Sequence, residues 1–402
     1  MNVKWVGGPC NPDSNGRHFH NQHPECEPMH QNNQSRTYLF AGGGTGGHLF
    51  PALAIAQRIK EKDPRSRIVF VGTRKGLENR IVPEFGFPLY RLTVRGFDRS
   101  RPLVNLWILL RLFWSLLQAL VLVIRIRPAV VIGTGGYVSG PVLFIANVLK
   151  KKTMVQEQNS YPGITTKWLA KYVDQVHIAF LDAKEYLPDA KNIHHSGNPV
   201  RELATCSSGE KARRHFNLRP DALTLFVFGG SQGARIINET VLQALPDLMQ
   251  ETDIQILWST GQTSYHTVRQ SVRNFSDRIQ IMGFIKEMGI AYQAADFVLC
   301  RAGALTLAEL TNQGLASILI PLKTAAENHQ EANAKSLVKL NAAVMIREDD
   351  LDKQRLIAEI KRLAMDPHLR IAMGQAARAS SFPNATETLA NAVMTLAHFS
   401  RK

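Results

Sequence analysis

Short apolar runs alternate with amphipathic stretches from residue 37 to the end of the chain, and this pattern predicts strands separated by helices. The apolar runs are too short for helices, and they lack the polar alternation of half-exposed strands. Buried strands with helices between them are typical of parallel sheets covered on both faces. The predicted strands fall in two series, at 38–40, 67–72, 88–94, 129–133 and 153–158, and at 224–228, 253–258, 278–284, 297–300, 316–320 and 343–346.

Each series opens on a glycine-rich loop, which predicts two doubly wound α/β domains. We place the first domain at 37–200 and the second at 201–383, with a further helix within 384–402. In such folds ligands bind at the carboxyl ends of the strands, and the glycine loops are predicted to lie there.

An apolar segment at 103–124 departs from this pattern, because its 22 residues would suit a membrane span. Arg111, Ser115, Gln118 and Arg125 are spaced to share one face of a helix, and a central arginine opposes insertion. A lone span would also remove an element from between two strands of one sheet. Three interpretations stay open: a transmembrane helix, a buried crossover helix, or a crossover helix that also enters a membrane surface.

The charge around this segment favours the membrane surface. The chain carries a net charge of +15, and residues 91–127 hold seven arginines against one acid, Asp98. Apolar and aromatic side chains beside such a cluster, here Trp107, Phe113 and Trp114, are what an anionic bilayer attracts. Nucleic acid would need the charge but not the aromatic residues, so we expect no nucleic-acid partner.

Residues 1–36 lack hydrophobic periodicity and an apolar core of the kind found in signal peptides. We interpret them as a disordered extension, or as residues ahead of a true start at Met29. The Cys and His residues of this tail show no standard zinc spacing. The chain's four cysteines are widely spaced, which indicates reduced thiols in a cytoplasmic protein.

Three glycine loops carry the candidate chemistry, at 41–48, 133–141 and 228–235. Glycines let a backbone approach a ligand, and the following helix start offers free N–H groups to a phosphate. No Lys-Ser/Thr pair follows the first loop, so it is not a P-loop, and the dinucleotide fingerprint is not met cleanly. His48 closes the first loop as a titratable group where a phosphate-bearing ligand would dock.

Other polar groups follow predicted strands. They are 157–159 (Glu-Gln-Asn), 198–201 (Asn-Pro-Val-Arg), Glu309, and His329, Gln330 and Asn333. Glu309 lies near a helix start. There it would either bind ribose hydroxyls or interact favourably with the helix dipole. Asp350 and Asp352 match an acidic metal motif in form, but a capping role is preferred. We therefore predict no metal site and no required cofactor.

Six motifs in this order closely resemble the MurG family: GGTGGH, GGYVSGP, EQN, GNPVR, GGSQGAR and ALTxxE. The resemblance covers about residues 37–400. It implies a GT-B fold, two Rossmann-like domains facing a cleft, with the C-terminal helix crossing back to the first domain. The implied reaction moves GlcNAc from UDP-GlcNAc to the C4 hydroxyl of MurNAc in lipid I, giving lipid II for peptidoglycan synthesis. We expect this reaction to need no metal.

The resemblance also implies where the enzyme acts. It would be a peripheral protein on the cytoplasmic face of the cell membrane, held at the anionic surface through residues 91–127. It would serve cell-wall synthesis, and hence cell shape and division, together with other cell-wall synthesis proteins.

The resemblance carries site roles to individual positions. Glu309 would hold the ribose, the backbone of Ile285 would meet the uracil, and Ser231 would meet the diphosphate. Further donor contacts would be Thr45, Gly46, Gly47, Asn159, Arg201, Ala304, Leu305, Thr306, Leu307, Ala308 and Gln330. The acceptor side would comprise Gly43, Gly44, Gly135, Gly136 and Asn238, and Tyr137 matches a catalytic position. The family often has His where this chain has Gln156, which leaves no clear role for Gln156.

The donor is α-linked and the family's product is β-linked, so the resemblance implies one inverting displacement with a base. We expect His48 to be that base, with acceptor positioning or helix capping as the alternatives. Three rival functions stay open: a GT-B transferase for another lipid, a sugar-nucleotide epimerase, and a nucleic-acid-binding protein. Only the epimerase would consume UDP-GlcNAc without an acceptor, and only the last would show steeply salt-dependent DNA binding.

Overall fold

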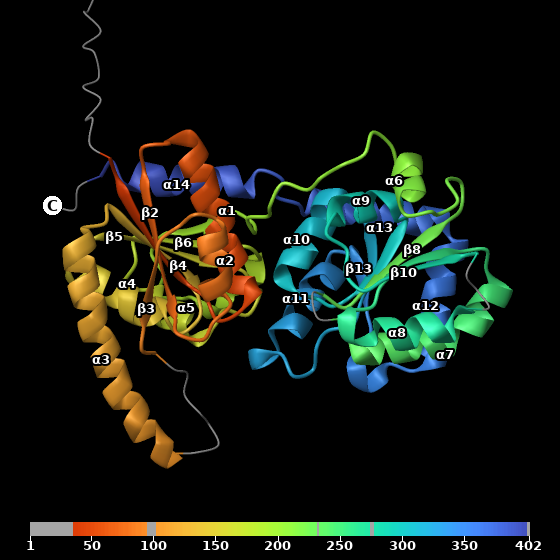
Figure 1. Ribbon diagram of the computed structural model, residues 1–402, viewed down its shortest axis with the longest axis horizontal. Coiled ribbons are helices and arrows are strands. Elements are labelled where there is room, and N and C mark those ends of the chain that lie inside the picture. The colour runs from red at the N-terminus through yellow and green to blue at the C-terminus, as the bar shows by residue number, and fades with distance from the viewer. Residues whose placement is uncertain (1–34, 95–101, 231–232, 274–276, 400–402) are drawn as a thin grey trace, which may run out of the picture. The chain divides into compact units, whose positions relative to one another are not determined.

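The computed structural model describes residues 35–94, 102–230, 233–273 and 277–399, with the side chains of 102–111 left out. The strands form two sheets in which every pairing is parallel (Figure 1). The first has the order β3-β2-β1-β4-β5-β6-β7, from β1 (Thr37–Gly42), β2 (Arg67–Thr73), β3 (Leu89–Leu92), β4 (Val130–Gly135), β5 (Lys152–Glu157), β6 (Gln175–Ile178) and β7 (Ile193–His195).

The second sheet has the order β10-β9-β8-β11-β12-β13. Its strands are β8 (Thr224–Phe228), β9 (Gln255–Ser259), β10 (Ile279–Met282), β11 (Phe297–Cys300), β12 (Ala316–Leu319) and β13 (Ala343–Met345). In both sheets the strand order reverses once, between β1 and β4 and between β8 and β11. Such a reversal opens a crevice at the carboxyl ends of the two strands. The three glycine loops follow β1, β4 and β8, so they lie at these two points.

Helices connect the strands and cover both faces of each sheet (Figure 1). With the first sheet are α1 (Gly46–Lys62), α2 (Glu78–Glu84), α3 (Pro102–Ile126), α4 (Ser139–Val148), α5 (Ile164–Leu169), the 3₁₀ helix η1 (Leu181–Tyr186) and α14 (Ala385–Leu396). With the second are α6 (Gly209–His215), α7 (Arg235–Glu251), α8 (Gln262–Ser271), α9 (Met288–Ala294), α10 (Ala304–Gln313), η3 (Ala326–Asn328), α11 (His329–Lys339), η4 (Glu348–Asp350), α12 (Lys353–Met365) and α13 (Pro367–Ala379).

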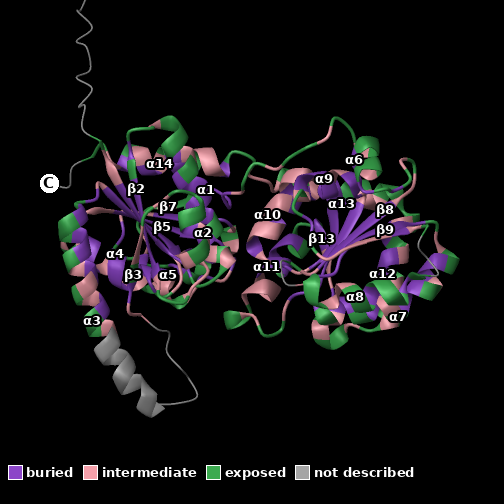
Figure 2. Ribbon diagram, viewed as in Figure 1, coloured by how far each residue is buried: buried purple, intermediate pink, exposed green. Residues whose placement is uncertain are grey.

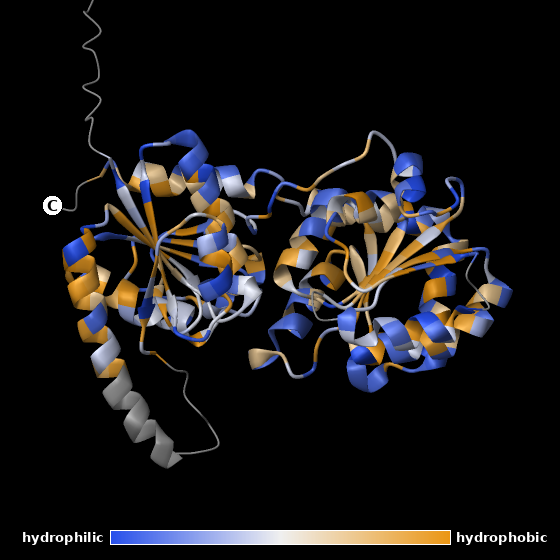
Figure 3. Ribbon diagram, viewed as in Figure 1, coloured by the Kyte–Doolittle hydropathy of each residue, from blue (hydrophilic) through white to orange (hydrophobic). Residues whose placement is uncertain are grey.

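The central strands are buried on both faces, while the outer faces of the helices are exposed (Figure 2). Each sheet therefore separates two hydrophobic clusters, and the apolar residues of its strands supply both (Figure 3). This confirms the prediction of two parallel, doubly covered sheets.

The C-terminal helix α14 packs against the first sheet, although the second sheet precedes it in the chain. Leu389, Ala390 and Val393 join the cluster that contains Tyr38 and Phe40. On its outer side, Glu387 pairs with Arg58 and Lys62 of α1. These cations hold the pKa of Glu387 down at about 2, chiefly through the hydrogen bond from Lys62. The helix is thus fixed to the first sheet by an apolar face and an ionic edge.

Helix α3 has an apolar outer face. Trp114, Leu117, Val121 and Ile124 recur at helical spacing and are 38–65% exposed. Of the predicted polar face, Ser115 and Gln118 turn inward, whereas Arg125 is exposed. Ser115 is buried and donates to the Leu112 carbonyl, and Gln118 accepts from the Thr93 N–H. No helix among the described residues is both long and apolar enough to cross a membrane.

Several residues named in the sequence predictions for this region are not described. Arg95, Asp98, Arg99 and Arg101 lie outside the described residues, as does the tail up to residue 34. The side chains of Trp107 and Arg111 are likewise not described. Arg91, Arg125 and Arg127 are described and exposed.

Candidate functional site

The first and second glycine loops contact each other at the reversal point of the first sheet. Gly42 at the end of β1 pairs with Gly135 at the end of β4. Gly136 has a φ of +78°, and a Cβ at this position would lie 2.7 Å from the Gly43 carbonyl oxygen. Only glycine allows both this backbone conformation and this approach. The two loops predicted to serve the acceptor therefore form one surface.

A buried carboxylate that no sequence motif marks supports the first loop. Glu78, at the start of α2, is fully buried and accepts hydrogen bonds from the N–H of Gly44 (2.9 Å) and from the N–H and hydroxyl of Thr73 (2.6 and 2.9 Å). These bonds offset the cost of burying its charge. The N–H of Gly44 thus donates inward to Glu78, although Gly44 itself is exposed.

The N–H groups of Gly46 and Gly47 are free of this constraint. Helix α1 begins at Gly46, so these two groups belong to the first turn and have no intrahelical acceptor. Thr45, the N-cap residue, is exposed, and its side chain makes no capping bond. The start of α1 therefore presents free N–H groups and a positive dipole end.

His48 lies where the two loops meet. Its half-buried ring contacts Gly135 so closely that a Cβ there would lie 2.5 Å from Nδ1. The backbone carbonyl of His48 accepts from the Thr134 hydroxyl (2.8 Å), and Nδ1 lies 2.9 Å from Gln158 Oε1. The Nδ1 side of the ring therefore faces Gly135 and Gln158. Beside it, Tyr137 is 59% exposed on the second loop.

The reversal point of the second sheet carries the candidate nucleotide-binding groups. Glu309 on α10 accepts a hydrogen bond from the Tyr292 hydroxyl (2.7 Å), and its other oxygen lies 3.9 Å from Arg201 Nε. Burial raises the pKa of Glu309, although Tyr292 and Arg201 act in the opposite direction. Burial, together with the neighbouring Glu309 charge, raises the pKa of Tyr292 well above its usual range. Tyr292 is therefore a neutral donor that orients the carboxylate.

The third glycine loop follows β8, which pairs with β11 at this reversal point. Gly230 and Gly233 have φ values of +90° and +77°, and a Cβ at Gly233 would clash with the Thr260 carbonyl. Ser231, predicted to meet the diphosphate, lies outside the described residues. Ile285 follows β10 with its side chain buried in the core, which leaves its backbone for any ligand contact. Gln330 accepts from the Leu322 N–H (3.0 Å).

Amide side chains link the residues of the two sheets. Asn333 of α11 accepts from the Ser160 N–H (2.8 Å) and donates to Asn159 Oδ1 (3.1 Å). Asn198 donates to the Ala304 carbonyl at the start of α10 (3.3 Å). Asn333 is fully buried, so it ties Asn159 in place instead of lying on the rim as an extra ligand donor.

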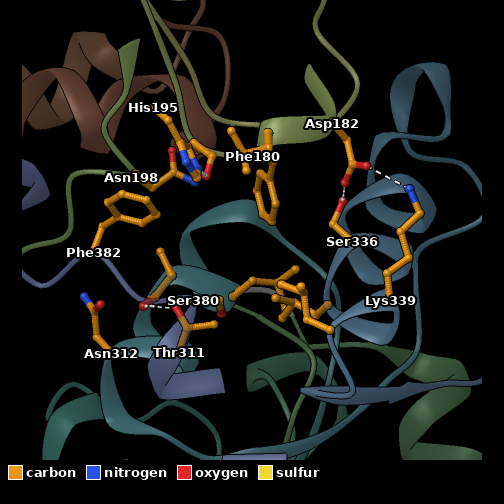
Figure 4. A pocket seen from close by; sticks show the side chains of 17 residues that line it. Phe180, Asp182, His195, Asn198, Thr311, Asn312, Ser336, Lys339, Ser380 and Phe382 are labelled. Carbon is orange, nitrogen blue, oxygen red and sulfur yellow. Dashed lines mark hydrogen bonds and ion pairs between the residues drawn. The ribbon is translucent and has the colours of Figure 1, made fainter. Parts of the chain in front are cut away.

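Residues 304–309, predicted as one run of donor contacts, point in different directions. Ala304 is buried, Leu305 and Thr306 are half-buried, and Glu309 turns to Tyr292. Leu307 and Ala308 instead line a separate cavity of about 210 Å³ with Phe180, His195 and Phe382 (Figure 4). The side chains of Leu307 and Glu309 therefore have different surroundings.

The comparisons with known proteins agree with this arrangement. Residues 38–178 match the glycosyltransferase family 28 N-terminal domain, and residues 224–389 match the family 28 C-terminal domain. A relative from Chlorobium limicola is 41% identical over 363 residues, which cover 89% of this chain and 99% of the relative. It is named UDP-N-acetylglucosamine–N-acetylmuramyl-(pentapeptide) pyrophosphoryl-undecaprenol N-acetylglucosamine transferase. The chain belongs to the MurG family.

Two further comparisons support this assignment. A protein with the same name from Chlorobaculum parvum is 43% identical and covers 89% of this chain and 98% of its own length. The crystal structure of Acinetobacter baumannii MurG is 27% identical, covers 90% of this chain and 100% of that chain, and superimposes with a TM-score of 0.73. The predicted GT-B fold is therefore confirmed.

One expected MurG site residue has a different position. Asn238, expected on the acceptor side, is buried on α7 beside the second sheet. It donates to the Thr260 carbonyl (2.9 Å) and accepts from the Trp258 indole N–H (3.0 Å). Both ends of its amide are thus occupied by the end of β9 and the residue after it. Asn238 therefore supports the strand end behind the third loop.

The acidic motif is explained by capping. Asp352 is the N-cap of α12, and its carboxylate accepts from the Arg355 N–H (2.7 Å). In the part of the chain that the structure describes, no three His, Cys, Asp or Glu side chains are grouped to hold a metal ion.

Proposed function

We propose that this chain transfers GlcNAc from UDP-GlcNAc to the C4 hydroxyl of MurNAc in lipid I and so produces lipid II for peptidoglycan. The relatives that carry this activity in their names match the chain along nearly its whole length. The observation that carries the proposal is the position of His48, where the free N–H groups of α1 and the second glycine loop meet. An imidazole and a helix start with free N–H groups are thus side by side.

The nucleotide would bind at the reversal point of the second sheet. Glu309, oriented by Tyr292, would accept hydrogen bonds from the ribose hydroxyls, and the backbone at Ile285 would meet the uracil. The third glycine loop would lie against the diphosphate. Arg201 belongs to the linker between the two sheets, and its guanidinium group lies near Glu309. It would therefore lie close to the bound nucleotide.

The acceptor would bind on the surface formed by the first two loops. Gly46 and Gly47, expected as donor contacts, would then meet the acceptor diphosphate instead. The C4 oxygen would attack the anomeric carbon of GlcNAc and form the new glycosidic bond. The bond from that carbon to the UDP oxygen breaks, and UDP leaves with its electron pair. The hydroxyl proton passes to His48, which would act as the general base. One displacement of this kind inverts the donor's α linkage.

We also propose that α3 lies against an anionic membrane surface. Its outer stripe of Trp114, Leu117, Val121 and Ile124 is apolar, and Arg91 and Arg125 flank it. A stripe of this kind beside arginines binds anionic lipid by burial and by charge. The protein would be peripheral at the cytoplasmic face, where it would meet lipid I and serve cell-wall growth, shape and division with other cell-wall proteins.

The decisive experiment supplies UDP-GlcNAc with lipid I, with diacylglycerol, or with no acceptor, and measures UDP release and the product. We expect UDP release and a disaccharide product with lipid I only. Release with diacylglycerol would indicate a transferase for another lipid. Loss of UDP-GlcNAc without an acceptor would indicate an epimerase. Steeply salt-dependent retention on DNA, with no turnover, would favour nucleic-acid binding.

A further inference from the structure

A chain of buried amides leads from the second sheet to His48. It consists of Asn198, Gln156 and Gln158, which are at most 3% exposed. Gln156 and Gln158 are two residues apart, on β5 and just after its end. The sequence alone gave Gln156 no role.

Backbone carbonyls fix the direction of each amide. The NH₂ group of Gln158 donates to the carbonyls of Thr134 and Gln156, both at 2.9 Å. If this amide were rotated by half a turn, its oxygen would face two carbonyl oxygens, and buried polar groups of like kind are costly. The Gln158 oxygen must therefore point at His48 Nδ1, 2.9 Å away.

The far end of the chain is fixed in the same way. The NH₂ group of Asn198 donates to the carbonyls of Gln158 (3.0 Å) and Ala304 (3.3 Å). Its oxygen accepts from the Gln156 NH₂ group (3.0 Å), and the Gln156 side-chain oxygen shares the two N–H donors of Gln158 with the carbonyls of Thr134 and Gln156. Every donor thus meets an acceptor, and the whole chain has one consistent direction.

This direction decides which ring nitrogen of His48 carries the proton. An amide oxygen accepts but cannot donate, so the nitrogen that faces it must be the N–H. The other nitrogen, Nε2, then carries the lone pair. We propose that Gln158 is a positioning residue that holds His48 in its Nδ1–H tautomer and so keeps Nε2 ready to take the acceptor's proton. This proposal rests on the proposed function only for the role of Nε2.

The tautomer can be measured without any assay of activity. The protein is labelled with ¹⁵N-histidine, and multiple-bond ¹H–¹⁵N spectra are recorded above the ordinary imidazole pKa of about 6.5. The His48 signals are identified by their loss in His48→Gln. We expect the cross-peak pattern of the Nδ1–H tautomer. The Nε2–H pattern would overturn the proposal, even if none of the variants below folds.

Variants then separate positioning from packing. We expect Gln158→Leu to shift His48 toward the Nε2–H tautomer and to lower kcat about 10- to 100-fold, with KM for UDP-GlcNAc nearly unchanged. Gln156→Leu leaves both carbonyl anchors of Gln158 in place, so it should keep the tautomer. Gln175→Leu is the matched control, because Gln175 Oε1 contacts the ring of another buried histidine, His177, in the same sheet.

Each result has a definite meaning. A fall in kcat in Gln158→Leu with an unchanged tautomer would show a packing role and contradict the proposal, and so would a changed tautomer with unchanged kcat. An Nδ1–H wild type that shows no UDP release with lipid I would contradict the proposed function but leave the tautomer assignment intact.

Discussion

At the scale of single residues, the site depends on side chains whose orientation is imposed by their neighbours. The Tyr292 hydroxyl orients Glu309, and the Gln158 amide faces His48. Glycine at 135 gives the His48 ring its place, because a Cβ would occupy the same space. A group held this way reacts without first reorganising, which is the main source of enzymatic rate enhancement.

Replacing His48 tests the base directly. We expect His48→Ala to lower kcat by about 10²- to 10⁴-fold, the range for loss of a general base. UDP affinity, measured by calorimetry, should stay close to that of the wild type, because the nucleotide would bind beside the other sheet. Turnover within about tenfold of the wild type would leave His48 only a positioning or capping role.

Removing the charge of Glu309 should weaken the nucleotide site. We expect Glu309→Gln to reduce UDP affinity by about 1.5–3 kcal/mol, the usual value for hydrogen bonds to a charged group. Burial raises the pKa of Glu309, so wild-type affinity should begin to fall at a higher pH than for an ordinary glutamate as the solution is acidified. The variant should lack this fall.

Calorimetric titrations with UDP over the acid range measure both effects. Glu251→Gln, which removes an exposed carboxylate paired with Lys361, is the control. An unchanged UDP affinity in Glu309→Gln would show that the ribose is held elsewhere.

At the scale of elements, α3 shows how a segment with one continuous apolar sequence can serve two surroundings. Ala119, Val123 and Ile126 pack into the core, while the opposite stripe is exposed. Two polar residues of this helix lie away from the solvent face, although Arg125 is exposed. Ser115 and Gln118 find backbone partners inside, which removes the cost of burying them.

Charges placed on the outer stripe of α3 should abolish membrane binding. We expect Trp114→Glu with Val121→Glu to lose retention on vesicles that contain anionic lipid at low salt, because both burial and attraction are reversed. The control adds the same charge to exposed apolar positions of the second domain, Met365→Glu with Ile371→Glu. Equal retention of the two double variants would refute the proposed surface.

The ionic edge of α14 should make stability depend on pH in a defined window. Lys62 and Arg58 lower the pKa of Glu387 from 4.5 to about 2. A lowered pKa means that the contribution is fully present above about 4.5 and is lost as the pH falls through about 2. Glu387→Gln should therefore melt below the wild type at neutral pH and match it near pH 2.

Thermal unfolding followed by circular dichroism checks this prediction. Glu239→Gln, which loses an exposed pair with Arg235 on α7, is the comparison. A difference between wild type and Glu387→Gln that stays constant with pH would exclude the ionic contribution.

At the scale of the whole molecule, the order of apolar and polar residues predicts the two sheets, because buried parallel strands are the most regular signal in the chain. Strands β6 and β7 escaped prediction, since they are short and contain His177, His194 and His195. Burial lowers the pKa of His177 to about 3, so a neutral histidine fits there as a core residue. The hydrophobic periodicity of the sequence does not reveal a histidine that is buried in a strand.

The candidate site was predictable only where motifs mark it. The glycine loops and Glu309 lie in contiguous motifs, so their resemblance to a family located them. Glu78 and the partners of Asn238 come from separate parts of the chain, and only the folded structure brings them together. Long-range side-chain contacts of this kind leave no local pattern.

Nucleotide binding should stabilise the whole chain, because α14 returns from the second sheet to pack on the first. UDP at about 100 times its Kd adds about 2.7 kcal/mol to the free energy of unfolding. We expect one melting transition that shifts upward, with the full shift in His48→Ala and a smaller one in Glu309→Gln. Two transitions, of which UDP moves only one, would show that the domains unfold independently.

The carboxylate beneath the first loop also constrains how this sequence can vary. Gly43, Gly72 and Gly76 come from three segments, and a Cβ at any of them would clash with Glu78. We therefore expect substitutions at Gly43, Gly72, Gly76 and Glu78 to depend on one another. In a library randomised at all four, alanine at a glycine position should be recovered in active clones only together with a shorter side chain at 78. Among natural relatives, the four positions should change jointly or not at all.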